Sequence, residues 1–135
     1  MILPDNICKI DNIIFTYDGK DSSVFAIRAF SNLFAGHSKN KPVSILTVMK
    51  SPDDEGIKNE KLLMELIKQH FNDVGIQLLE GNTISDEISN FAGTVNNPLI
   101  VMGAYGRSRF SNILLPSVAR HIMTKSRLPL FIAHR

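Results

Sequence analysis

The sequence predicts an α/β fold in which a doubly wound, five-stranded parallel sheet forms the middle of three layers. Short apolar runs alternate with longer segments whose apolar residues recur every three or four positions. The order is strand-helix four times and then a strand, which is typical of a parallel sheet with helices on both faces. With 135 residues, 44% of them hydrophobic, the chain is expected to form a single domain over residues 1–135.

Five short apolar runs, bounded by turn residues and helix breakers, predict the strands. In chain order they cover residues 12–17, 43–49, 75–79, 99–102 and 128–133. The first run is rich in β-forming residues and is closed by Asp18-Gly19, so it is expected to be a buried strand that ends in a turn.

The segments between the first three runs predict two helices. Ser22 or Ser23 is expected to cap the first helix, in which apolar residues recur at three- and four-residue steps until Gly36 ends it. Residues 57–71 predict the second helix, because their apolar residues share one helical face and their charged residues lie elsewhere.

Two further helices are predicted in the second half of the chain. Ser85 is expected to begin the third, with Asp86 and Glu87 in the first turn, where the helix dipole favours negative charge. Ile113 or Pro116 opens the fourth helix, which leads into the last strand.

The composition argues against several classes of partner. Fifteen basic and 13 acidic residues leave a net charge of +2, so we expect neither a nucleic-acid surface nor a membrane surface. No apolar run approaches the ~18 residues of a membrane span, and the first residues do not resemble a signal peptide. The single cysteine and the four histidines lack metal-ligand spacing, so no metal site is predicted. We therefore expect a cytoplasmic protein.

Residues suited to ligand binding follow the first and fourth predicted strands. Ligands of such sheets bind beyond the carboxyl ends of the strands, where the strand order reverses. Gly103 and Gly106 would let the backbone approach an anion closely and adopt positive φ angles. Asp18 could accept hydrogen bonds from a ribose or a base amine, and Ser117 would offer a hydroxyl and an amide at a helix start.

This glycine pattern is not specific by its spacing alone. Two glycines three residues apart are equally compatible with a plain turn. The segment has no Gly-Lys-Ser/Thr of a phosphate-binding P-loop, and its glycines follow the fourth strand rather than the first, unlike those of a dinucleotide fingerprint. The position after a strand and before a helix is what favours an anion site.

The chain resembles the universal stress protein family over nearly its whole length. The family signature is Gly, two residues, Gly, nine residues, Gly, then Ser or Thr; Gly103 and Gly106 match it, and Pro116-Ser117 stands at the final pair. Residues 99–108, LIVMGAYGRS, resemble the family's fourth strand and loop, and residues 15–19, FTYDG, resemble its first strand and acidic turn.

The resemblance implies a strand order of 3-2-1-4-5, as in adenine nucleotide alpha-hydrolase-like folds. It implies a homodimer that pairs the C-terminal strands, Leu128 to Ala133, of two chains. It also implies that ATP or AMP binds, with Mg²⁺ if the ligand is a triphosphate. The residues implied in nucleotide binding are Thr16, Tyr17, Asp18, Val48, Gly103, Gly106, Arg107, Ser117 and Val118. Arg107 is also compatible with a solvated loop position.

Three functions stay open at this point. The first is a dimeric stress-response regulatory module that binds an adenine nucleotide weakly and contacts a protein partner still to be identified. The second is a dimerising module without a nucleotide, which Pro116 favours. The third, a slow ATP hydrolase, is disfavoured because Asp18 is the only candidate base and no lysine is expected near the phosphates. No catalytic residue is therefore assigned.

Pro116 is expected to weaken nucleotide binding, because proline has no amide hydrogen to donate to a phosphate. A charge-assisted hydrogen bond contributes about 1.5–3 kcal/mol, so its loss lowers affinity roughly tenfold to a hundredfold. Pro116→Gly should therefore raise the affinity for ATP by about this factor without changing the fold, as measured by calorimetric titration. An unchanged affinity would show that proline is not the obstacle.

Overall fold

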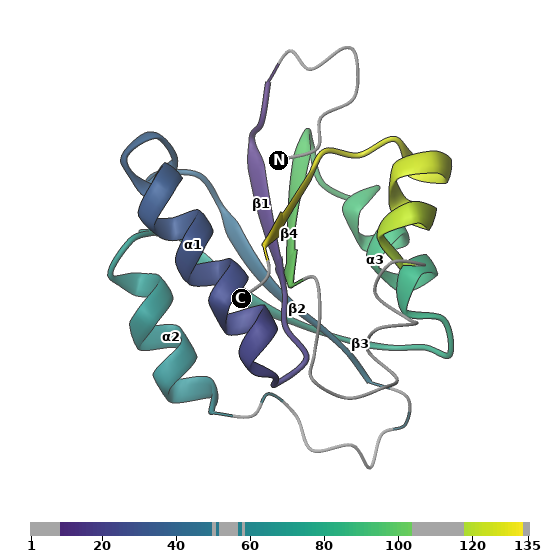
Figure 1. The fold of residues 1–135 in the computed structure, drawn as a ribbon, viewed down its shortest axis with the longest axis horizontal. Helices are drawn as coiled ribbons and strands as arrows, with labels where there is room; N and C mark the ends of the chain where they lie inside the picture. The colour runs from purple at the N-terminus through teal and green to yellow at the C-terminus, as the bar shows by residue number, and fades with distance from the viewer. Residues whose placement is uncertain (1–8, 50, 52–56, 58, 104–117, 134–135) are drawn as a thin grey trace.

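The computed structural model describes residues 9–49, 51, 57, 59–103 and 118–133, and these form a five-stranded sheet between two layers of helices (Figure 1). The strands are β1 (Asn12–Thr16), β2 (Val43–Met49), β3 (Val74–Glu80), β4 (Pro98–Gly103) and β5 (Leu130–Ala133). They lie in the order β3-β2-β1-β4-β5, and every neighbouring pair is parallel. The predicted fold class and strand order are confirmed.

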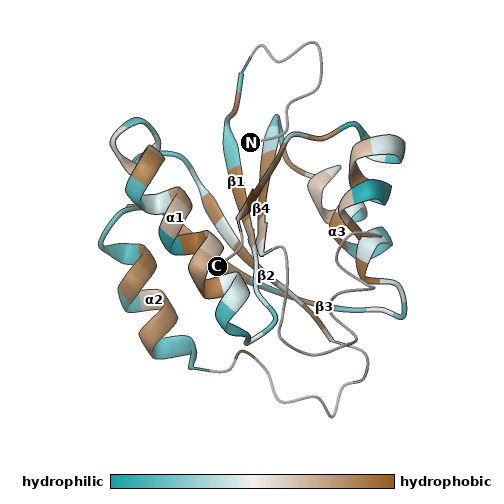
Figure 2. Cartoon of the chain, viewed as in Figure 1, coloured by the Kyte–Doolittle hydropathy of each residue, from teal (hydrophilic) through white to brown (hydrophobic). Residues whose placement is uncertain are grey.

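The helices divide between the two faces of the sheet. Helices α1 (Asp21–Ser38) and α2 (Glu60–Lys68) cover one face; α3 (Ile84–Ala92) and a helical segment at 118–126 cover the other (Figure 1). That last segment ends in a short π-helix, η1 (Ile122–Ser126). Buried apolar residues of the helices pack with those of the strands, and Figure 2 shows hydrophobic residues along both kinds of element. Because successive strand side chains point to opposite faces, the sheet buries a separate apolar cluster on each side.

Aromatic rings fill the cluster between α1 and the sheet. The ring of Phe30 on α1 lies 5.8 Å from that of Phe15 on β1 and 5.4 Å from that of Phe131 on β5, centroid to centroid and edge to face. Phe71 packs edge to face against Phe15 at 5.6 Å. These contacts hold α1 against the centre of the sheet, so they also position its N-terminus at the carboxyl ends of β1 and β4.

The ends of α1 differ from the prediction. The helix begins at Asp21 after Lys20, so Ser22 and Ser23 lie within its first turn and do not cap it. It also continues through Gly36 to Ser38. A glycine inside a helix costs only about 1 kcal/mol, which the burial of the opposite face of α1 outweighs.

Other boundaries shift by smaller amounts. Helix α2 is shorter than predicted at both ends. It begins only after Asn59, because Asn59 takes a left-handed conformation (φ 55°). It ends before Phe71, which is buried beyond the last turn. Helix α3 begins one residue earlier, at Ile84, and its first turn holds the two predicted acidic residues. The last strand begins at Leu130, because Arg127 takes a left-handed conformation (φ 50°) and delays the extended chain. The predicted start of the fourth helix lies outside the described residues.

Candidate functional site

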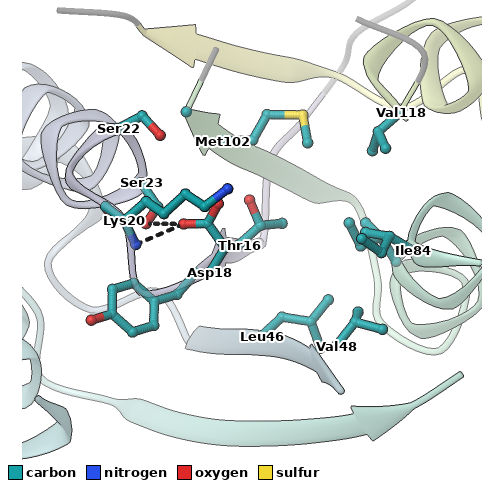
Figure 3. A pocket seen from close by; sticks show the side chains of 13 residues that line it. Thr16, Asp18, Lys20, Ser22, Ser23, Leu46, Val48, Ile84, Met102 and Val118 are labelled. Carbon is teal, nitrogen blue, oxygen red and sulfur yellow. Dashed lines mark hydrogen bonds between the residues drawn. The ribbon is translucent and has the colours of Figure 1, made fainter. Parts of the chain in front are cut away.

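A pocket of about 270 Å³ lies beyond the carboxyl ends of β1, β2 and β4, between the start of α1 and the start of α3 (Figure 3). One part of its lining is apolar and comes from β2, α3, β4 and the last helical segment: Leu46, Val48, Ile84, Ile88, Met102 and Val118. The other part comes from the end of β1, the start of α1 and the end of β4: Thr16, Tyr17, Asp18, Lys20, Ser22, Ser23 and Gly103. The pocket is therefore apolar on one side and polar on the other.

The structure brings together every predicted nucleotide-binding residue that it describes. These residues line the pocket and are Thr16, Tyr17, Asp18, Val48, Gly103 and Val118. Gly106, Arg107 and Ser117, and also Pro116, lie outside the described residues. The contacts of all these residues with a ligand stay a prediction.

Asp18 is held in a turn at the mouth of the pocket. Its Oδ1 accepts hydrogen bonds from the backbone amide of Lys20 (2.9 Å) and from the hydroxyl of Ser23 (2.9 Å), both drawn in Figure 3. The turn needs Gly19, whose φ of 80° is strained for any residue with a side chain. Because both hydrogen bonds reach Oδ1, Oδ2 accepts no hydrogen bond from the described residues, and its lone pairs can accept one from a ligand.

Thr16 and Tyr17 act as structural links between the strands. The hydroxyl of Thr16 donates to the carbonyl of Val101 on β4 (3.1 Å), and the hydroxyl of Thr47 on β2 donates to the carbonyl of Tyr17 (2.9 Å). The Tyr17 ring packs in the apolar cluster under α1 and α2. Burial, and then the negative charge of Asp18, raise the pKa of the Tyr17 phenol above its usual value. Tyr17 is thus a neutral packing residue at physiological pH.

Gly103 allows the end of β4 to pack directly on the first turn of α1. A Cβ atom at this position would lie 2.5 Å from the carbonyl carbon and oxygen of Ser22 and 2.8 Å from the amide nitrogen of Ser23. The positive φ angle expected here is wrong, since among the described glycines only Gly19 has one. The first glycine of the signature is required in this chain for a close approach of two backbone segments.

The family assignment follows from sequence comparison. A model of the universal stress protein family matches residues 9–134. The chain belongs to this family. It is 30% identical over 131 residues to universal stress protein MJ0577 of Methanocaldococcus jannaschii, covering 94% of this chain and 79% of that one. It is 25% identical over 132 residues to a universal stress protein of Synechocystis sp., covering 96% of this chain and 44% of that relative, less than half its length.

Solved structures of universal stress proteins share the fold. The structure of MJ0577 superimposes with a TM-score of 0.71 at 20% identity, covering 93% of this chain and 96% of that one. A universal stress protein from Archaeoglobus fulgidus gives a TM-score of 0.64 at 20% identity, with 93% and 98% covered. A universal stress protein in complex with cAMP gives 0.63 at 18% identity, with 92% and 97% covered. At these identities the likeness shows the fold alone.

Sequence reasoning missed several residues that line the pocket of this universal stress protein. No lysine was expected near the phosphates, and that expectation stays a prediction. Lys20, which lines the pocket together with Asp18, was not considered as a site residue. The sequence could have indicated this role for Lys20, since Lys20 follows Asp18-Gly19 directly at the end of the first predicted strand. Ser22 was considered only as one of two alternative caps, with Ser23. Its place in the pocket depends on how α1 packs against β4 at Gly103.

The described residues contain neither a candidate metal site nor a candidate membrane span. Within residues 9–103 and 118–133, apart from the gaps given above, no three His, Cys, Asp or Glu side chains are grouped to hold a metal ion. In the same part of the chain, no helix is both long and apolar enough to cross a membrane.

Proposed function

We propose that this universal stress protein binds an adenine nucleotide, ATP or AMP, in the pocket beyond β1 and β4 and acts as a stress-response regulatory module. The observation that carries this proposal is the two-sided lining of the pocket. An apolar wall suits a base, and the carboxylate of Asp18 at the mouth suits a ribose hydroxyl or a base amine.

The size of the pocket agrees with a ligand of this kind. Small-molecule sites usually measure about 300 Å³ or more, and the volume here, about 270 Å³, lies near that lower limit. Val48, at the end of β2, and Ile88, on α3, lie on the apolar side, where a planar base would be buried. The solved family member in complex with cAMP supports the same ligand class, since cAMP contains both adenine and a phosphate.

Val48→Phe should weaken nucleotide binding about tenfold or more, because the larger ring would occupy the space proposed for the base. Val48 is only half-buried, so the fold should tolerate the ring with little loss of stability. Calorimetric titration of the wild type and the variant with AMP and with Mg-ATP measures the effect.

Leu78→Phe is the matched control, since Leu78 lies on the neighbouring strand β3, is 47% exposed and does not line the pocket. Its affinity should equal that of the wild type. Absence of heat from the wild type at millimolar nucleotide, together with no nucleotide released on denaturation, would reject the proposed function. If Val48→Phe and Leu78→Phe bind the nucleotides with equal affinity, the base does not lie against Val48.

Dimerisation through β5 stays a prediction. The strand lies at the edge of the sheet, with Ile132 and Ala133 half-buried. An edge strand offers unpaired backbone groups to a second strand, which supports pairing between two copies. A dimerising module without a nucleotide is the alternative function, and the observation that favours it is Pro116 in place of the third signature glycine.

A further inference from the structure

We propose that the first turn of α1, with Lys20 and Ser22, forms an anion subsite that binds a phosphate group of the nucleotide. This inference rests on the proposed nucleotide site and extends it. It places a phosphate at the junction of β1 and α1, in addition to the signature loop that follows β4.

The first observation is the missing cap of α1. The amides in the first turn of a helix lack carbonyl partners within the helix and are usually satisfied by an oxygen of the residue that precedes it. Here that residue is Lys20, whose side chain makes no capping hydrogen bond. The amides of Ser23 and Val24 reach the carbonyl of Lys20, at 3.2 and 3.4 Å. The amides of Asp21 and Ser22 precede those bonds, at the positive end of the helix dipole.

The second observation is the hydroxyl of Ser22. The residue is only 7% exposed and lines the pocket (Figure 3). Its hydroxyl forms no hydrogen bond with the part of the chain that the structure describes, whereas the neighbouring Ser23 hydroxyl is bonded to both Asp18 and Lys20. Among the described residues no fully buried side-chain nitrogen or oxygen lacks a partner, so the unbonded Ser22 hydroxyl keeps access to the pocket. A ligand oxygen in the pocket could accept a hydrogen bond from this hydroxyl.

The third observation is the charge at this junction. Lys20 lines the same pocket as Ser22, and its side chain extends along the pocket from the start of α1 (Figure 3). Asp18 brings a negative charge nearby, but its Oδ1 is occupied by two hydrogen bonds within the turn. An ammonium, a serine hydroxyl and the N-terminus of an 18-residue helix together favour a phosphate. This subsite would offset part of the binding lost at Pro116.

Lys20→Gln should weaken AMP binding roughly tenfold to a hundredfold and leave adenosine binding unchanged, because only AMP carries the group that Lys20 would contact. Ser22→Ala should weaken AMP binding by a smaller factor, about twofold to tenfold, since a neutral hydrogen bond contributes less. Lys20→Arg should retain most of the affinity. Calorimetric titrations with AMP, adenosine and inorganic pyrophosphate measure these effects.

Lys39→Gln is the matched control, because it removes the same charge at the exposed opposite end of α1. The subsite is supported if Lys20→Gln loses affinity for AMP but not for adenosine, while the affinities of the Lys39→Gln control stay unchanged. Equal losses for AMP and adenosine, or no loss, overturn the subsite and leave the proposed function intact. If the wild type binds neither AMP nor adenosine, the proposed function fails, and pyrophosphate binding that depends on Lys20 would still support the anion subsite. No binding of any of the three probes overturns both.

Discussion

Gly103→Val is expected to destabilise the protein by about 3 kcal/mol, the upper end of the usual range for overpacking. The first side-chain carbon would lie 2.5 Å from the backbone of Ser22, so either β4 or the first turn of α1 must move. The φ angle of Gly103 is not positive and valine favours strands, so the loss would measure this clash rather than backbone strain. Chemical denaturation monitored by circular dichroism measures the free energy of unfolding.

The same variant should also lower nucleotide affinity, because displacement of the α1 N-terminus moves Ser22 away from the pocket. Gly75→Val is the matched control: Gly75 lies on β3, and a Cβ there would meet nothing within 4 Å. The control should be neutral or slightly stabilising, since glycine weakens a strand by roughly 0.5–1 kcal/mol. Wild-type stability of Gly103→Val would contradict the close packing of β4 on α1.

Phe30→Ala should cost about 3–5 kcal/mol, the usual range for removing a buried phenylalanine ring. Phe30 is 2% exposed, and its ring packs with four other rings, those of Phe15, Phe34, Phe71 and Phe131, of which that of Phe34 is nearest at 5.1 Å. The loss is a large share of the ~5–15 kcal/mol by which domains are usually stable. Urea denaturation gives the change in unfolding free energy.

Phe25→Ala on the same helix separates ring burial from helix propensity. Phe25 is 36% exposed, so its truncation should cost about 1 kcal/mol or less. If Phe30→Ala and Phe25→Ala lower the free energy of unfolding by similar amounts, α1 is not held by the aromatic cluster. In that case the position of the α1 N-terminus at the pocket would need another cause.

The strands were predictable because their signal is local. A strand buried on both faces of a parallel sheet is a short continuous apolar run, and the run at 43–49 has the bounds of β2 in the structure. The ends of the helices were less predictable, because they depend on contacts. Ser23 looks like a cap in the sequence, but in the structure its hydroxyl bonds to Asp18 and Lys20 from inside the first turn.

The candidate site was partly predictable for a related reason. Asp18 and Gly103 directly follow predicted strands, and the carboxyl ends of parallel strands share one edge of a sheet. The apolar wall was not predicted, since Ile84 and Ile88 come from a helix whose placement over this edge no local pattern indicates. Lys20 was overlooked although it follows Asp18-Gly19 directly in the chain.

The sequence by itself determined the alternation of strands and helices and the turn residues at the strand ends, because apolar periodicity and turn chemistry act over a few neighbouring residues. Only the tertiary structure decided that the N-terminus of α1 lies against the end of β4, with Ser22 in the pocket. That contact joins residues about eighty positions apart, and it exists because Gly103 has no side chain to keep the two backbones apart.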